Sequence, residues 1–273
     1  TPGDHEGPVT ERASSPHAHI APSEARDVLV ALRNVEHLAK SPRVGQAVVV
    51  ELLPEVQAGL PRLASFFRAM LEHKAGDDPA CDVGRLALES VQRVAVAAER
   101  ARAATTRQSA GARLGLERVL AEDLPRLEAC VEACEMWTRA SAGRRAELTL
   151  RDVVAAVLEP CAPEAPGRVW ASLPDGDVRV VADATVVLWL CRGALAARAA
   201  ASLVARPPGD DAGPALEVVA EAPAGGVPMC PRGPLPKVVY EDALASVAAA
   251  AGLGFDAAPG RMTFRFGHAS ALA

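Results

Sequence analysis

Aromatic side chains are scarce in this chain of 273 residues: only 3% are Phe, Trp or Tyr, although 50% are apolar. The core must therefore be filled by Ala, Val and Leu, which suits closely packed helices. A large excess of positive charge is also missing, because 29 basic residues face 34 acidic ones for a net charge of −5. That balance argues against a broad nucleic-acid surface, which would have to neutralise phosphates.

Long hydrophobic runs and common catalytic motifs are missing as well. No stretch approaches the roughly 20 apolar residues that a membrane span needs, and the polar, proline-containing start is unlike a signal peptide. We therefore expect a cytoplasmic protein with no membrane association. The GxSxG, GxxxxGK[ST] and HExxH patterns do not occur, which leaves no motif for a serine hydrolase, a P-loop nucleotidase or a zinc protease.

The six cysteines form no CxxC pair and join no histidine cluster with zinc-ligand spacing. Cys130 and Cys134 are one helical turn apart and share a helix face. We interpret both as small core residues in a reducing cytoplasm. A two-ligand metal site is the alternative, but the nearby sequence supplies no further ligands. We expect no metal and no cofactor.

The chain divides into three parts by composition. Residues 1–22 carry four prolines and three histidines and are expected to be a flexible tail. Residues 23–141 show helical apolar spacing and predict about four helices in up-down order, a bundle. We expect those helices to run from Ser23 to about Ala39, from Val44 to Ala75, from Val83 to Ala104 and from Leu114 to Ala140, with kinks or short breaks at Pro54 and Pro61 and a kink at Pro125.

Residues 147–267 mix short alternating segments with helical ones, which predicts an α+β sandwich with helices on one face of a sheet. Expected strands lie near 148, at 169–173, 178–181, 216–220, 255–257 and 262–266. Expected helices follow the first strand up to 158 and cover 185–204 and 241–251. The Gly252-Leu253-Gly254 sequence is too short for a dinucleotide fingerprint and is expected to end the last helix.

The order of these segments resembles the catalytic core of sensor histidine kinases. Residues 116–158 are similar to the second dimerisation helix, its polar exit and the opening of the ATP-binding domain. Residues 178–202 are similar to the strand, Asp and long helix of the Asn box, and 242–266 to the last helix and closing hairpin. The resemblance covers about two-thirds of the chain. It implies an N-terminal helical bundle followed by a histidine-kinase ATPase-like α/β sandwich, and a homodimer through the bundle.

Three features that the family uses to hold ATP are missing. The Mg²⁺-binding Asn would fall near Ala197, and 178–202 contains no Asn. The adenine-binding Asp would fall at Ala222 in the stretch 221–228. The glycine-rich lid should precede Tyr240, where prolines remove N–H donors that would cradle phosphates. The resemblance therefore implies a kinase architecture without its ATP chemistry.

His37 is the candidate phosphoacceptor. It is followed by Ser41-Pro42 at the family's spacing, with Lys40 at the basic position. Leu38 stands where the family has a carboxylate, and Glu36 lies on the wrong side. His37 is off the apolar stripe and should face solvent, as phosphotransfer requires. The alternative is a plain surface histidine before a helix-breaking proline.

Two functions follow as expectations. The first is a signalling or scaffold protein of bacterial two-component type, a pseudokinase that acts through protein–protein interaction. The second is a histidine phosphotransferase in a phosphorelay, with His37 exchanging phosphate with a response-regulator receiver domain. We expect a homodimer through the bundle, because Leu116, Leu120 and Leu124 belong to a long apolar stripe. Four helices in one chain could instead close their own bundle and leave a monomer.

Overall fold

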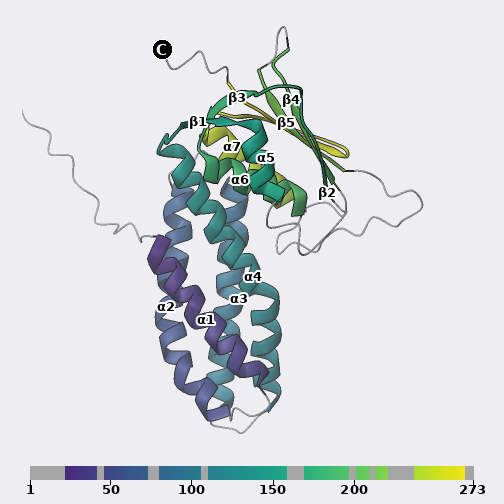
Figure 1. Cartoon of the computed structure of the whole chain (residues 1–273). Coiled ribbons are helices and arrows are strands. Elements are labelled where there is room, and N and C mark those ends of the chain that lie inside the picture. The colour runs from purple at the N-terminus through teal and green to yellow at the C-terminus, as the bar shows by residue number, and fades with distance from the viewer. Residues whose placement is uncertain are drawn as a thin grey trace, which may run out of the picture.

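The computed structural model describes residues 22–41, 46–72, 80–105, 110–158, 169–196, 201–209, 213–220 and 237–267. Within these ranges the fold is α+β, with an N-terminal helical bundle followed by a region built around a sheet (Figure 1). The predicted fold class is confirmed. The expected tail at 1–22 lies outside the described residues except for Pro22. No described helix is long and apolar enough to cross a membrane.

The bundle consists of α1 (Pro22–Lys40), α2 (Gln46–Glu72), α3 (Ala80–Thr105) and α4 (Ala110–Ser141). Each helix packs against the next, and α1 also packs against α4, so the four helices form a closed ring within one chain. Their apolar stripes meet in a core of Leu, Val and Ala. The α4 stripe that suggested a dimer seam is buried inside this ring, and its members are at most 2% exposed: Leu116, Leu120, Leu124, Leu127 and Val131.

The helix α2 continues through Pro54 and Pro61, and α4 continues through Pro125. The short breaks that the α2 prolines suggested do not occur. A proline in a helix interior costs about 3 kcal/mol, but α2 buries apolar side chains on every turn around both prolines: Leu53, Val56, Leu60, Leu63 and Phe67. Burial of that stripe outweighs the backbone cost, since each side chain contributes about 1.5–3 kcal/mol.

The described residues of the second region form two sheets and three helices. The elements are β1 (Ala146–Thr149), α5 (Leu150–Leu158), β2 (Val169–Ser172), β3 (Arg179–Ala182), α6 (Ala184–Ala196), β4 (Ala201–Arg206), β5 (Ala215–Ala220), α7 (Lys237–Ala250), β6 (Gly254–Ala258) and β7 (Arg261–Arg265). β1 pairs with β3. The other strands form a sheet in the order β2-β4-β5-β7-β6, in which only β2 and β4 are parallel.

One core joins this sheet to its helices. Buried side chains of α5, α6 and α7 pack together with those of β4, β5 and β7. Figure 1 shows α6 and α7 between the sheet and the end of the bundle. α7 contacts both α3 and α4, and α6 contacts α4. The expected arrangement, helices covering one face of a sheet, is confirmed.

The expected helix at 185–204 is wrong in its second half. α6 ends at Ala196, and residues 201–206 form the strand β4. This segment is rich in Ala, Val and Leu, which suit a buried strand and a buried helix alike. Pairing decides the outcome, because β4 lies between β2 and β5 and its ladder with β5 runs from Ala201 to Arg206.

The expected end of the last helix at Gly252 is confirmed. Gly252 has a φ of +71°, which residues with a Cβ rarely adopt. The Leu253 N–H donates to the Ala248 carbonyl at 2.9 Å, and the Gly252 N–H donates to the Ala249 carbonyl at 3.0 Å. This pair of bonds is a Schellman cap, which satisfies carbonyls that the end of α7 would otherwise leave unpaired.

Candidate functional site

His37 lies in the last turn of α1 and is exposed. The stripe of α1 that faces the core is buried, with Val28, Leu32 and Val35 at 7% exposure or less. His37 falls outside that stripe because helical spacing places it on the opposite side. Its predicted exposure is therefore confirmed. Its predicted role as phosphoacceptor stays a prediction.

Glu36, the carboxylate next to His37 in the sequence, bonds to two other side chains. Glu36 is 5% exposed. Its Oε1 accepts a hydrogen bond from Lys40 Nζ at 2.7 Å, and its Oε2 accepts one from Arg33 at 3.0 Å. Burial alone would raise the pKa of Glu36, but the bonds and charges of the two cations outweigh burial and lower it. Glu36 is thus an ionised anchor for two cations rather than a base for the imidazole.

Leu38, on the other side of His37, packs against the bundle core. A residue at this position is directed toward the interior, so the family's carboxylate has no counterpart here. Among the described residues, no carboxylate bonds to the His37 imidazole. A general base typically contributes 10²–10⁴-fold in rate. His37 therefore offers an exposed nitrogen nucleophile without a described carboxylate that could act as its general base.

Ion pairs between α1 and α4 show which residues of the two helices lie side by side, and from them the position of His37 along the bundle follows. Arg26 Nε donates to Glu135 Oε1 at 2.6 Å, and Arg33 Nε donates to Glu128 Oε1 at 3.1 Å. The two helices are therefore antiparallel, and α1 ends at the far end of the bundle (Figure 1). At 1.5 Å per residue, His37 lies about 25 Å along the bundle from the last turn of α4.

Asp183, which the sequence aligns with the Asp before the family's Asn-box helix, has a structural role in this chain. Its Oδ1 accepts hydrogen bonds from the backbone N–H of Thr185 at 2.9 Å and of Val186 at 3.3 Å, which caps the start of α6. Its Oδ2 accepts a bond from Arg139 Nε at 2.8 Å. Asp183 therefore ties the end of the bundle to the first turn of α6.

Most of the segments in which the family binds ATP lie outside the described residues. These are the position near Ala197, the stretch 221–228 and residues 231–236. The described helix of the Asn-box segment is α6, whose only hydroxyl or charged side chains are Thr185 and Arg192. It presents neither a carboxylate nor a carboxamide to a metal ion.

The cysteines in the described residues are buried, as the core interpretation predicts. Burial raises the pKa of Cys130 and of Cys191 to about 12, so both stay protonated thiols. Cys134 contacts Met70 of α2, with 2.9 Å between the sulfur atoms. Cys161 and Cys230 lie outside the described residues.

The contact between Glu132 of α4 and Trp189 of α6 could not be predicted from the sequence. Glu132 of α4 has a raised pKa, first because it is partly buried and second because Glu135 is near, although a hydrogen bond from Trp189 acts in the opposite direction. Trp189 of α6 is half-buried and packs against both cores. The two residues are 57 positions apart, so only the docking of α6 on α4 brings them together.

Comparisons with known proteins give weak likenesses. No family model matches the chain, and no curated protein does. Solved structures similar to it include Acinetobacter baumannii histidine kinase AdeS, at 13% identity over 55% of this chain and 81% of that one, with a TM-score of 0.35. A histidine kinase from Burkholderia phymatum STM815 is 19% identical over 68% of this chain and 96% of that one, with a TM-score of 0.33.

A third solved structure, a bacterial phosphotransferase, is 15% identical over 67% of this chain and 95% of that one. Its TM-score is 0.28. At TM-scores this low, no conclusion about the fold or function of this chain rests on these likenesses. The fold class rests on the elements of the chain itself.

Proposed function

We propose that this chain is a cytoplasmic signalling or scaffold protein with a histidine-kinase-like architecture, in which 23–141 and 147–267 are its two domains. It binds no ATP and acts through contacts with another protein. The observation that carries this proposal is the segment that resembles the Asn box. The sequence of 178–202 contains no Asn, and α6, the described helix of that segment, has no carboxylate or carboxamide side chain.

Asp183 has a structural role that suits a scaffold. Both carboxylate oxygens are engaged, one by the α6 backbone and one by Arg139. The residue therefore holds two parts of the fold together.

Thermal unfolding of the whole chain in Mg·ATP tests the proposal. A ligand that binds only the folded state at 100 times its Kd stabilises it by about 2.7 kcal/mol, which would raise the Tm of a chain this size by several degrees. We expect no rise at millimolar Mg·ATP compared with Mg²⁺ alone. A rise in Tm that Mg·ATP causes and Mg²⁺ alone does not would overturn the loss of ATP binding.

A histidine phosphotransferase is the second candidate. The observation that favours it is the exposure of His37 on a helical bundle. The distance of about 25 Å between His37 and the end of α4 means that phosphate would have to come from a separate protein, such as a receiver domain. The missing carboxylate beside the imidazole is why we rank this function second.

A further inference from the structure

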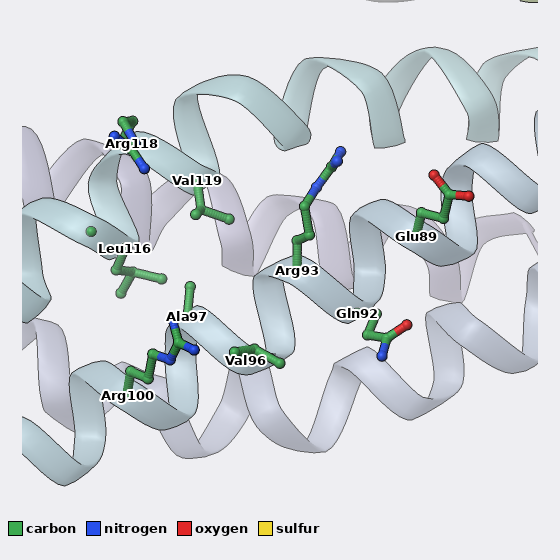
Figure 2. Close-up of a pocket in the computed structure, with 10 residues that line it drawn as sticks. Glu89, Gln92, Arg93, Val96, Ala97, Arg100, Leu116, Arg118 and Val119 are labelled. Carbon is green, nitrogen blue, oxygen red and sulfur yellow. The ribbon is translucent and has the colours of Figure 1, made fainter.

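A groove of about 690 Å³ runs between α3 and α4 on the outside of the bundle (Figure 2). α3 lines one wall with residues spaced three or four apart from Glu89 to Arg100. α4 lines the other with residues 115–119. The α3 wall is 12 residues long, so it spans about 17 Å. That length accommodates three turns of another helix.

The floor of the groove is apolar. It contains Val96 and Ala97 of α3 and Leu116 and Val119 of α4. Val96 is 39% exposed, and Leu114, next in sequence to the α4 wall, is 65% exposed. Side chains of this kind gain about 25 cal/mol for each Å² that a partner covers.

Two arginines of the groove have no partner among the residues that the structure describes. Arg93 is satisfied, because it pairs with Asp123 and donates to Ser90. Arg100 and Arg118 make no hydrogen bond or ion pair within the described residues. Figure 2 shows Arg100 on α3 and Arg118 on α4 toward the same end of the groove. That end is therefore cationic in a chain whose net charge is −5.

The two neighbouring grooves of the bundle lack this imbalance. The groove between α2 and α3 is lined by two arginines and two glutamates, and Arg102 there bonds to Gln57. In the groove between α1 and α4, Arg26 and Arg33 are both paired with glutamates. Of these three grooves, only the one between α3 and α4 combines an apolar floor with a lining that has more arginines than acidic residues.

Gly115 leaves one wall of the groove open. It lies inside α4, where glycine costs about 1 kcal/mol relative to alanine. A Cβ built at this position meets no described atom within 4 Å. Packing within the described chain therefore does not require the glycine, and its bare backbone permits a close approach from outside.

We propose that the α3–α4 groove binds an amphipathic helix of a partner protein, with apolar residues against Val96 and Val119 and acidic residues against Arg100 and Arg118. This mode buries apolar side chains spaced three or four apart in the groove. The charge pairs select acidic partners and speed association. The inference rests on the proposed function in one respect, that the chain acts through protein contacts.

The test uses the full chain and two stapled, fluorescein-labelled helical peptides of about 14 residues. Both carry leucines along one face; one carries flanking glutamates and the other lysines at the same positions. We expect the acidic peptide to saturate below about 100 µM by fluorescence anisotropy, more weakly as salt rises. The lysine peptide should not saturate in that range. Equal binding of the two peptides, or no binding of the acidic one, overturns the proposal.

Variants assign the binding to the groove. Arg100→Glu with Arg118→Glu should weaken the acidic peptide on the order of tenfold or more. Gly115→Leu should block it sterically with an unchanged circular dichroism spectrum, because the space beside Gly115 is open. Arg62→Glu with Arg68→Glu is the matched control, since it makes the same charge change at two exposed positions outside the groove. Binding that survives the groove variants, or is lost equally in the control, overturns the proposal.

Two further measurements separate the possible failures. Light scattering of the chain alone shows whether the groove takes a second copy. Self-association abolished by Gly115→Leu would overturn the choice of an acidic partner helix. Thermal unfolding of the same variants in Mg·ATP reports on the proposed function, because a nucleotide-induced rise in Tm would overturn the loss of ATP binding without touching the groove.

Discussion

At the scale of single residues, Glu36 shows how a charge beside a candidate active residue can be entirely structural. It is 5% exposed and bonds to Arg33 and Lys40. The i, i+3 and i, i+4 spacing of these residues is visible in the sequence. Their helical pairing was therefore predictable, whereas the burial of Glu36 depends on the position of α1 in the bundle.

Glu36→Gln should lower the free energy of unfolding by about 0.5–2 kcal/mol. The pKa of Glu36 is lowered in the folded state from its ordinary value of 4.5. A lowered carboxyl pKa contributes stability that is full above the unfolded-state value and is lost as pH falls through the folded-state value. Urea denaturation should therefore show the full difference at pH 7 and a shrinking one below about pH 4.5. A difference that grows toward low pH would contradict this assignment.

His37→Ala tests the second candidate function at the same scale. Because His37 is exposed, the substitution should leave the thermal unfolding curve unchanged. In the scaffold account, the wild-type chain takes no acid-labile label from ³²P-phosphorylated receiver domains within minutes. Robust labelling of the wild type that His37→Ala abolishes would make the relay the better function.

At the scale of elements, the sequence predicted the helices of the bundle more reliably than the boundary between α6 and β4. The α4 pattern repeats an apolar residue every three or four positions over many turns, and this periodicity indicates a helix and no other element. Residues 201–205 are all small or apolar. Their pairing with β5, a strand that starts at Ala215, decides the structure, and local sequence carries no record of that pairing.

The end of α7 offers a clean prediction about backbone conformation. Gly252 has a φ of +71°, and a Cβ there would lie 2.6 Å from a guanidinium nitrogen of Arg145. Gly260 has a φ of +77° and no described atom within 4 Å of such a Cβ. Gly252→Ala should therefore lower the free energy of unfolding by about 1–3 kcal/mol.

Gly260→Ala is the matched control because it carries the same backbone strain without the contact. Because Arg145 is exposed and its guanidinium can move aside, the two variants should cost similar amounts in the same chemical denaturation experiment, and Arg145→Ala should change neither loss. A much larger loss for Gly252→Ala would contradict this expectation and show that the Arg145 side chain cannot move aside.

At the scale of the whole molecule, the closed ring of α1–α4 bears on assembly. The apolar stripe of α4 suggested a homodimer, and its residues are buried within one chain. The sequence left both outcomes open, because a stripe does not state whether its partner helices come from the same chain. The ring favours the monomer alternative.

We therefore expect light scattering at tens of micromolar to give the mass of one chain, 28.3 kDa. A mass twice as large, unchanged on dilution, would restore the homodimer and require a seam on the outer faces of the helices. Gly115→Leu would then show whether the α3–α4 groove is part of that seam.

The candidate site could be predicted only in part for a related reason. The exposure of His37 followed from helical periodicity, since its neighbours Val35 and Ala39 belong to the buried stripe. The distance of His37 from the sheet region and the bond between Arg139 and Asp183 depend on how the helices associate. The unpaired arginines of the α3–α4 groove have the same origin, because no local pattern shows which charges lack partners.

Calorimetric titration of the whole chain with Mg·ATP tests the central claim most directly. We predict heats no larger than those of dilution, meaning no site with a Kd of about 1 mM or tighter, because 178–202 contains no Asn and α6, the described helix of that segment, has no carboxylate or carboxamide side chain. A saturable isotherm with a stoichiometry near one ATP for each chain would contradict it.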